Sequence, residues 1–431
     1  MNKENNMKVL VVGSGGREHA ICTSIRKSPR LTKLYCAPGN AGIAQIAECV
    51  PIGVMEFDRI AAFAKDNAID LVVVAPDDPL AAGLVDVLNE NGIRAFGPKK
   101  NAAILEGSKA FSKDLMKKYG IPTAAYENFD DPKEALKYLE NCSYPIVLKA
   151  DGLALGKGVL ICKDHDEAVA GVKEIMEDKK FGDSGNRMVI EEFMTGREVS
   201  VLSFCDGKTI RIMTSAQDHK RAKDHDEGLN TGGMGTFSPS PFYTKEVDEF
   251  CKAQIYQKTV DAMASEGRPF KGVIFFGLMI TKDGPKALEY NVRLGDPETQ
   301  AVLPMMDFDF AELCQSIMDG TLESFDMKWK SGFQVAPVVV SGGYPLKYPK
   351  GKEITLDSAK IDNAGAKVFV AGAVRNEGKL VTSGGRVLAC SAHGESFDEA
   401  WKKAYEAIEG IKFDGAFYRK DIGLPGAAES N

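Results

Sequence analysis

The sequence has neither an excess of basic residues nor a long apolar run. Its 431 residues include 54 Lys and Arg against 61 Asp and Glu, which gives a net charge of -7. Proteins that bind nucleic acids usually carry a basic excess, so the balance argues against such a partner. No stretch approaches the ~20 apolar residues that span a membrane, and the N-terminal residues lack a signal-peptide core. We therefore expect a cytoplasmic protein without a nucleic-acid or membrane partner.

Cysteine and histidine are too scattered to indicate a zinc site or a disulfide framework. The nine cysteines form no CxxC pair, and the five histidines do not cluster with them. Closely spaced pairs are the usual sign of zinc, and small secreted domains show regular cysteine spacing. A reducing compartment is therefore the expected environment.

The composition is that of an ordinary globular protein. Hydrophobic residues make up 44% and charged residues 27% of the chain. A chain of this length usually contains about three domains. The order of the expected elements suggests four units, at residues 1–107, 108–195, 196–330 and 331–431.

The first unit has the pattern of a parallel α/β sheet. Short apolar runs alternate there with helical segments, at residues 8–12, 34–37 and 71–75. Each run ends in a loop that is rich in Gly, Pro, Asn or Asp. Ligands of such sheets bind beyond the carboxyl ends of the strands, so these loops are candidate binding segments.

The loop Gly13-Ser-Gly-Gly16 opens a helix and partly matches a dinucleotide fingerprint. Glu18 replaces the third glycine of that fingerprint, and Ala37-Pro-Gly39 stands where a ribose-binding acid is expected. Both differences disfavour a nicotinamide dinucleotide. Backbone N–H groups at a helix N-terminus can still hold a smaller phosphorylated ligand. A tight turn without a ligand is the alternative.

The second unit contains a strand that ends in a lysine, Tyr144–Lys149, and a glycine-rich loop, residues 150–158. A returning strand follows at residues 159–162, which suggests a loop that closes over phosphates. The loop is not a Walker A motif, because no Gly-Lys-Ser/Thr ends it and no helix follows. A further apolar strand, Met188–Met194, runs into two carboxylates.

The third unit contains a predicted hairpin with polar and charged side chains on one face of its second strand. Residues 272–280 are almost wholly apolar, and Asp283-Gly284 is a typical turn. Residues 287–293 alternate, with Leu288, Tyr290 and Val292 expected on one face and Glu289, Asn291 and Arg293 on the other. Carboxylate and amide oxygens suit Mg²⁺, and a guanidinium suits phosphate. A solvated strand face is the alternative.

Two further segments of this unit attract attention. Gln217–Asp224 is densely charged, and Asn230-Thr-Gly-Gly-Met-Gly235 suggests close approach of the backbone to a ligand. Charge clusters are commonly solvated surfaces, so the first segment alone is weak evidence for a binding site. The last unit carries the motifs Ser341-Gly-Gly-Tyr-Pro345 and Ser383-Gly-Gly-Arg386.

Taken in order, these segments resemble a known family. Lys149, the loop 152–158, the strand end 191–194 and the Glu289/Asn291 pair look like an ATP-grasp nucleotide site. Five phrases together resemble the phosphoribosylamine–glycine ligase family, also called glycinamide ribonucleotide synthetase: residues 12–19, 38–42, 149–158, 217–221 with 230–235, and 291–298. The resemblance extends from Lys8 to about Ile411. Each phrase is moderately specific, but their combination in this order is very specific.

The resemblance implies a fold and an activity. The fold is α/β, an ATP-grasp fold with an N-terminal parallel α/β (Rossmann-like) domain and a small C-terminal α+β domain. The activity is ATP-dependent ligation of glycine to 5-phosphoribosylamine through glycyl phosphate, in purine biosynthesis. The implied cofactor is Mg²⁺ or Mn²⁺, the substrates are small molecules, and we expect a monomer.

The resemblance also implies roles for individual residues. The implied ATP-binding residues are Lys109, Lys149, Gly152, Gly156, Lys157, Gly158, Glu191, Phe193, Met194 and Glu198. Among them, the lysines would neutralise phosphates, Glu191 and the backbone of Phe193 and Met194 would hold adenine, and Glu198 would hold ribose. The implied metal ligands are Glu289 and Asn291. The implied catalytic residues are Arg293, Asp218, Lys220 and Asp296, and the implied substrate-binding residues are Gly13, Gly15, Gly16, Asn40, Arg221, Gly232 and Gly233.

Three other interpretations remain open at this point. The chain could ligate or carboxylate a different small purine intermediate, or it could bind ATP as a sensor without turnover. A nicotinamide oxidoreductase is the third, and Glu18 weakens it. Phosphoryl transfer relies mainly on positioning and charge neutralisation, and the sequence accordingly shows no Ser-His-Asp or Cys-His arrangement.

Overall fold

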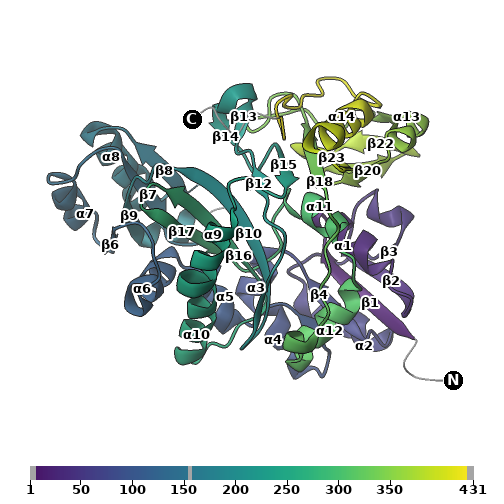
Figure 1. The fold of residues 1–431 in the computed structure, drawn as a ribbon, viewed down its shortest axis with the longest axis horizontal. Helices are drawn as coiled ribbons and strands as arrows, with labels where there is room; N and C mark the ends of the chain where they lie inside the picture. Colours follow the sequence, from purple (N-terminus) through teal and green to yellow (C-terminus); the bar gives the residue numbers. More distant parts are fainter. Residues whose placement is uncertain (1–5, 154–157, 425–431) are drawn as a thin grey trace.

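A computed structural model describes residues 6–153 and 158–424 (Figure 1). The N-terminal unit is built around a parallel five-stranded sheet of order β3-β2-β1-β4-β5. Its strands are β1 (Met7–Gly13), β2 (Leu31–Pro38), β3 (Glu48–Cys49), β4 (Leu71–Val74) and β5 (Ala95–Phe96). Its helices are α1 (Gly16–Ile25), η2 (Ile43–Gln45), α2 (Phe57–Asp66), α3 (Asp77–Ala82), α4 (Leu84–Glu90) and α5 (Lys100–Gly107). The expectation of a parallel α/β unit is confirmed.

The apolar runs of the sequence explain this sheet. Strands β1 and β4 are buried on both faces, as strands covered by helices on either side must be. Strand β1 pairs with β2 on one side and with β4 on the other, so the chain order reverses at β1. Ligands of open α/β sheets bind beyond the strand ends at such a reversal. The glycine loop after β1 occupies that position.

The second unit is a four-stranded antiparallel sheet of order β6-β9-β7-β8 with helices packed on it. The strands are β6 (Tyr126–Phe129), β7 (Ile146–Ala150), β8 (Val159–Cys162) and β9 (Met188–Glu192). The helical segments are α6 (Lys109–Tyr119), α7 (Pro132–Leu139), α8 (His165–Val172), a π-helical turn (Lys173–Glu177) and a 3₁₀ turn (Gly182–Asn186). Helix α6 begins where the Ser108 hydroxyl accepts the Phe111 N–H, and it ends at the left-handed Gly120.

The third unit contains a second antiparallel sheet, of order β11-β10-β16-β17. The strands are β10 (Arg197–Asp206), β11 (Ile210–Ile212), β16 (Lys271–Thr281) and β17 (Gly284–Asn291). The helical segments are α9 (Lys245–Cys251), a π-helical turn (Lys252–Tyr256), α10 (Gln257–Ser265), α11 (Thr299–Val302), η7 (Leu303–Met305), α12 (Phe310–Asp319) and η8 (Leu322–Ser324). The predicted hairpin is therefore β16–β17.

One detail of this hairpin was predicted wrongly. Gly277 faces Glu289 and Leu278 faces Ala287, so Leu288 is an extra residue in a β-bulge. The bulge breaks the alternation, and Leu288 does not share a face with Tyr290 and Val292. It packs instead against a small apolar cluster of Ala124, Met194 and Met279.

The last unit has an α+β arrangement around an antiparallel sheet of order β12-β15-β18-β23-β20. Its strands are β12 (Gln217–Asp218), β15 (Gly235–Ser238), β18 (Phe333–Val340), β20 (Ala366–Val370) and β23 (Arg386–Gly394). Three two-stranded pairs accompany it: β13 (Arg221–Lys223) with β14 (Glu227–Asn230), β19 (Thr355–Leu356) with β24 (Ile411–Lys412), and β21 (Ala373–Asn376) with β22 (Lys379–Thr382). The helical segments are η5 (Asp224–Asp226), α13 (Ser358–Asn363) and α14 (Phe397–Ile408). Since β12 and β15 precede residue 331, this sheet draws strands from two of the four expected units.

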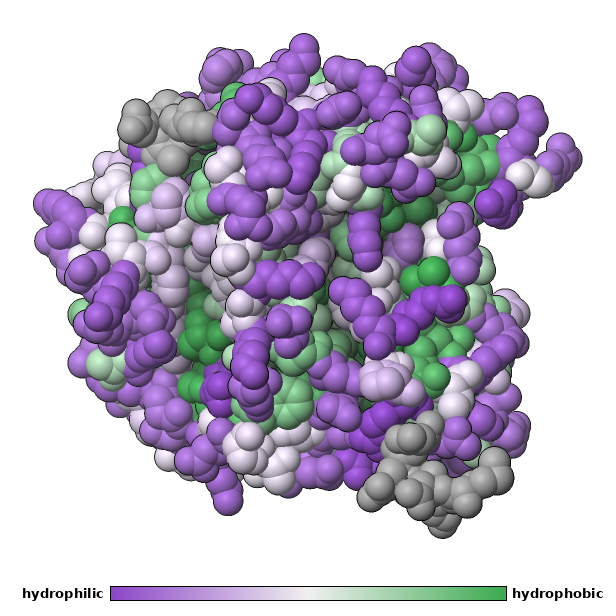
Figure 2. Space-filling model, turned by 45° about the vertical axis from the view of Figure 1, so that its right-hand side comes forward, coloured by the Kyte–Doolittle hydropathy of each residue, from purple (hydrophilic) through white to green (hydrophobic). Residues whose placement is uncertain are grey.

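The surface fits the composition. On the face in Figure 2, hydrophilic residues cover most of the outer surface, and hydrophobic residues show mainly in recessed areas between them. Within residues 6–153 and 158–424, no helix has the length and apolarity that crossing a membrane requires.

Candidate active site

The loop after β17 joins the N-terminal, central and C-terminal units at one residue, Asp296. Its carboxylate accepts the backbone N–H of Arg17 at 3.2 Å, at the start of helix α1. It also accepts the side-chain amide of Gln300 at 2.9 Å. Arg386, from β23, donates to the backbone carbonyl of Asp296 at 2.6 Å and lies 3.4 Å from its carboxylate. Three segments that are distant in sequence therefore meet at one carboxylate.

The charges around Asp296 keep it ionised. Burial alone would raise the pKa of this carboxyl, but Arg386 and Arg17 together lower it below its ordinary value. Arg17 also donates to the Leu294 carbonyl at 3.1 Å. The arginines thus fix both the charge and the orientation of the loop.

The glycine loop packs tightly against the same residues. Gly13 has a left-handed backbone (φ +131°), and a Cβ on Gly16 would lie 2.5 Å from the side-chain nitrogen of Gln300. The N–H of Gly15 is bonded to the Glu18 carboxylate, which caps the helix. Two amides at this N-terminus, those of Gly15 and Arg17, therefore already have carboxylate partners. Close packing against Gln300 is therefore one reason why this loop contains glycine, whether or not it also binds a ligand.

Asn40 supports this loop rather than projecting from it. Its side-chain nitrogen donates to the carbonyls of Ser14 at 2.8 Å and Val370 at 2.7 Å. Its side-chain oxygen accepts the N–H groups of Gly42 and Ile43. With these bonds formed, the Asn40 amide positions the glycine loop against the C-terminal unit.

The predicted ATP residues gather between the second and third units. The Glu191 carboxylate bridges two lysines, Lys149 and Lys113, each at 2.9 Å. All three side chains are buried. Lys109 donates to the carbonyls of Ala150 at 3.1 Å and Gly152 at 2.6 Å, at the start of the glycine-rich loop.

Lys113 was not recognised in the sequence. It lies one helical turn after Lys109 on α6, and it also donates to the Thr123 hydroxyl at 2.8 Å. Burial lowers the pKa of Lys113 to about 8, against the opposing effect of Glu191. The spacing of four residues from Lys109 was the available signal, but a helical lysine is more often on the surface.

Replacing Lys113 with Met is expected to lower the free energy of unfolding by roughly 2 kcal/mol, because the buried Glu191 keeps Lys149 but loses the charged hydrogen bond from Lys113. Lys118→Met is a matched control on the same helix, since Lys118 forms an exposed pair with Glu266 at 2.6 Å. Urea unfolding followed by circular dichroism measures both. Equal stabilities of the two variants would contradict the importance of the buried cluster.

A small apolar cluster lies near these charges. Ala124, Met194 and Met279 form a buried cluster, and Leu288 packs against it through the bulge. Phe193 is exposed at the adjoining turn. Ligand sites are lined mainly by apolar side chains, so the cluster and Phe193 make this region a candidate for contact with a purine base.

Of the remaining predicted ATP residues, the structure describes Glu198, Gly152 and Gly158. Glu198 lies on β10 and is partly exposed to solvent. The protein around its carboxyl group partly desolvates it, which raises the pKa of Glu198. Gly152 is left-handed (φ +147°), and the Gly158 carbonyl accepts the Ala150 N–H at 2.8 Å. Gly156 and Lys157 lie outside the described residues.

The predicted metal ligands lie on one face of β17. Glu289 and Asn291 are two residues apart beyond the bulge, and solvent reaches the Glu289 carboxylate. Protein surroundings would raise the pKa of Glu289, but Lys149, Lys220, Lys109 and Arg293 together lower it. An ionised carboxylate beside an amide oxygen fits a hard divalent cation that also takes phosphate oxygens. Among the described residues, no group of three or more His, Cys, Asp or Glu side chains is arranged to hold a metal ion.

Arg293 is held by a carboxylate that the sequence did not reveal. Glu106, at the end of α5, accepts the Val292 N–H at 2.7 Å and lies 3.3 Å from the Arg293 guanidinium. Arg293 also donates to the Asn291 side chain at 3.3 Å. No local pattern marks Glu106, because its partners are almost 190 residues away.

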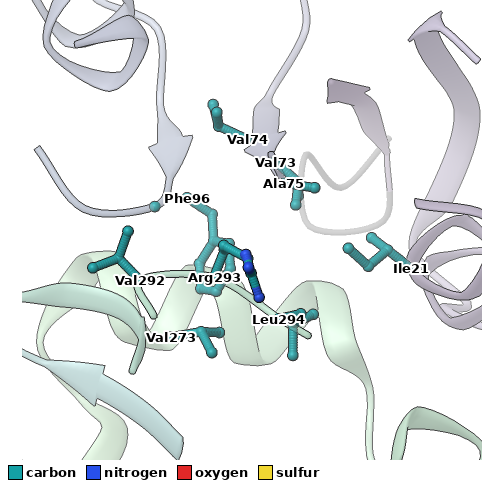
Figure 3. Close-up of a pocket in the computed structure, with 10 residues that line it drawn as sticks. Ile21, Val73, Val74, Ala75, Phe96, Val273, Val292, Arg293 and Leu294 are labelled. Carbon is teal, nitrogen blue, oxygen red and sulfur yellow. The ribbon is translucent and has the colours of Figure 1, made fainter. Parts of the chain in front are cut away.

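A small cavity lies beside Arg293 (Figure 3). Apolar residues of β4, β5 and the loop after β17 line it, including Val73, Phe96 and Leu294. Its volume is about 10 Å³. This volume holds about one water molecule at most, so the cavity is not a substrate site.

Asp218 and Lys220 form a second charged pair near Asp296. Their side chains are 3.2 Å apart, and the Asp218 side chain is almost inaccessible to solvent. Burial raises the pKa of Asp218 to about 7 despite Lys220. Gly233 is left-handed (φ +120°), and a Cβ there would lie 2.7 Å from the Asp218 carboxylate.

Two more predicted substrate residues can be placed. The Gly232 carbonyl accepts a hydrogen bond from Arg386 at 2.7 Å, and the Gly232 N–H donates to the Tyr344 hydroxyl at 3.0 Å. The Arg221 guanidinium donates to the Gly228 carbonyl at 2.9 Å. The structure therefore brings Gly232 to the junction at Asp296, whereas the Arg221 guanidinium is engaged within the β13–β14 hairpin.

Comparison with known proteins identifies the family of the chain. Models of the phosphoribosylglycinamide synthetase N, ATP-grasp (A) and C domains match residues 7–106, 107–299 and 334–425. The chain belongs to the phosphoribosylglycinamide synthetase family. It is 49% identical to the phosphoribosylamine–glycine ligase of Clostridium acetobutylicum, over 97% of this chain and 99% of that protein.

Solved structures support the family and its fold. The crystal structure of the Thermotoga maritima phosphoribosylamine–glycine ligase matches with a TM-score of 0.84 and 36% identity, over 96% of this chain and 100% of that chain. The biotin carboxylase domain of the Hydrogenobacter thermophilus 2-oxoglutarate carboxylase, solved with MgADP, matches with a TM-score of 0.73 and 16% identity, over 95% of this chain and 91% of that one. The second likeness shows the fold alone. The predicted family and ATP-grasp fold are thus confirmed.

Proposed function

We propose that this protein is an ATP-dependent ligase that joins glycine to 5-phosphoribosylamine. The products are glycinamide ribonucleotide, ADP and phosphate, and the reaction belongs to purine biosynthesis. Family membership over nearly the whole chain supports this activity. The single structural observation that carries it is the convergence at Asp296 of the loop after β17, the start of α1 and Arg386.

ATP binds between the second and third units in this proposal. The backbone of Phe193 and Met194, with the apolar cluster beside it, holds adenine, and Glu198 holds ribose. Lys109 and Lys149 neutralise the phosphates, together with the glycine-rich loop. Glu191 orients Lys149, because its carboxylate already contacts that lysine.

Glu289 and Asn291 are the residues that would hold Mg²⁺ or Mn²⁺. The ion, when bound, neutralises charge on the phosphate oxygens. Arg293 faces the transferring phosphoryl group and is oriented by Glu106. Positioning and charge neutralisation of this kind suffice for phosphoryl transfer, so no nucleophilic side chain is required.

The chemistry proceeds in two balanced steps. A carboxylate oxygen of glycine takes the γ-phosphoryl group, giving glycyl phosphate and ADP. The amine of phosphoribosylamine then attacks the carbonyl carbon, the C–N bond forms, and the bond to phosphate breaks as the amine loses a proton. Asp218, Lys220 and Asp296 line the meeting point of the substrates, and the Gly13–Gly16 loop and Gly232–Gly233 bind phosphoribosylamine.

The cellular setting is also a proposal. We infer a cytoplasmic monomer whose four units, at residues 1–107, 108–195, 196–330 and 331–431, divide substrate binding and nucleotide binding. The free state of all nine cysteines supports a reducing compartment.

A coupled assay of ADP release tests the proposal. With Mg²⁺, ATP, glycine and phosphoribosylamine, we expect steady ADP formation that stops when glycine is omitted. Replacing glycine by alanine or bicarbonate is the control for other ligases or carboxylases of this fold. Tight ATP binding without glycine-dependent ADP release would show a nucleotide-binding sensor instead.

A further inference from the structure

The β13–β14 hairpin has little support of its own. It is a separate two-stranded sheet, and all four residues of β14 are exposed. Two-stranded hairpins are marginally stable in water unless other elements pack on them. The turn between the strands contains His225 (φ 60°) and Asp226 (φ 54°) in left-handed conformations. Such residues persist where the surroundings hold them in place.

The C-terminal segment Phe413–Leu424 supplies these surroundings. Arg419 donates to the Asp226 carboxylate at 2.8 Å and to the Arg221 carbonyl at 3.1 Å. Asp421 accepts the His225 N–H at 3.0 Å. The Lys420 N–H donates to the Asp224 carboxylate at 2.7 Å. Strand β13 and the turn are thus attached to a segment almost 200 residues away.

The Arg419 side chain is buried and held in a fixed orientation. Its side chain is 1% exposed and is among the largest fully buried side chains of the described residues. Two of its nitrogens bind the two Asp421 oxygens at 2.7 and 2.6 Å. A bidentate pair fixes the plane of the guanidinium, and its remaining nitrogen then points at the hairpin.

The hairpin in turn leads directly into the substrate residues. Lys220 immediately precedes β13, and Thr231 follows β14. The Thr231 N–H and hydroxyl both donate to the Lys220 carbonyl at 2.8 Å. Gly232 and Gly233 come next in the chain. We therefore expect any displacement of the hairpin to move Lys220 and the Gly232–Gly233 turn together.

We propose that Arg419 is a positioning residue, through which the C-terminal segment holds the β13–β14 hairpin and so places Lys220 and the Gly232–Gly233 turn for phosphoribosylamine. This inference rests on the proposed function for the identity of the substrate. It assigns the C-terminal segment a role in substrate binding that acts through the hairpin.

The test combines hydrogen exchange with kinetics on the full-length protein. Asp226→Asn removes one charged contact of Arg419 from a partly exposed residue, and Arg419→Met removes all of its hydrogen bonds. Lys360→Met is the matched control, because Lys360 forms an ion pair with Glu409 at 2.6 Å in the same C-terminal unit without contacting the hairpin. Backbone exchange is followed by mass spectrometry over residues 221–230.

In both test variants we expect exchange in residues 221–230 to rise on the order of tenfold or more. The KM for phosphoribosylamine should rise severalfold, and by more than the KM for ATP, on which displacement of Lys220 acts only through its charge near Glu198 and Glu289. The control should match wild type in both readouts. Unchanged exchange in Asp226→Asn would overturn the anchor, and faster exchange with an unchanged KM for phosphoribosylamine would overturn the link to substrate. If wild type releases no ADP in response to glycine, the proposed function fails, whereas the exchange data still decide whether the anchor exists.

Discussion

Glu289→Gln is expected to reduce the rate of ligation at least ~100-fold, which corresponds to about 2.7 kcal/mol in the activation free energy. The substitution keeps the shape of the side chain but removes the negative charge beside Lys149, Lys220 and Arg293. A divalent cation would lose its charged ligand, and the neighbouring cations would lose their counter-charge. Asn291→Ala should act in the same direction, because it removes the adjacent amide oxygen.

Turnover at saturating Mg²⁺ measures this effect, and thermal unfolding checks the fold. Glu353→Gln is a matched control, since Glu353 forms an exposed pair with Lys379 at 2.7 Å in the C-terminal unit. That variant should retain wild-type turnover. If Glu289→Gln kept more than about a tenth of the wild-type rate, the loss would be below ~1.4 kcal/mol and the ligand assignment would be wrong.

Asp296→Asn is expected to lower kcat on the order of 100-fold, or roughly 2.7 kcal/mol. The wild-type carboxylate accepts hydrogen bonds from both the Arg17 N–H and the Gln300 amide. An asparagine accepts at only one of its two terminal atoms, so one of these donors must lose its partner. The charges of Arg17 and Arg386 also lose their compensation at the junction of the units.

ATP affinity separates this effect from general damage. The residues that we propose for nucleotide binding lie between the second and third units, so the Kd for ATP should remain close to the wild-type value in Asp296→Asn. Asp414→Asn, which alters an exposed pair with Lys352, is the control for the C-terminal unit. A rate for Asp296→Asn within threefold of wild type would remove Asp296 from the catalytic centre.

Much of the fold could be predicted because its elements are locally encoded. Strands β1 and β4 are short apolar runs that end in glycine or proline, and α6 has Ser108 before it and Gly120 after it. The parallel sheet, the hairpin β16–β17 and the family motifs follow from such signals. The bulge at Leu288 does not, because it depends on how β17 registers with β16.

The site was predicted less completely, for a physical reason. Glu289 and Asn291 were placed on one face by the period of a strand, and that placement needs only the local chain. Glu106, Lys113 and Arg386 acquire their roles from partners distant in sequence, or from burial. The engagement of Arg221 within its own hairpin likewise depends on a fold that no short pattern encodes.

The fate of the glycine carboxylate oxygens tests the central claim most directly. The wild-type protein is incubated with ATP, phosphoribosylamine and glycine labelled with oxygen-18 in the carboxylate, and the released phosphate is analysed by mass spectrometry. If glycine is activated as glycyl phosphate, one labelled oxygen should appear in each phosphate and the other should remain in the amide product. Phosphate without label, with the second labelled oxygen released as water instead, would contradict the account.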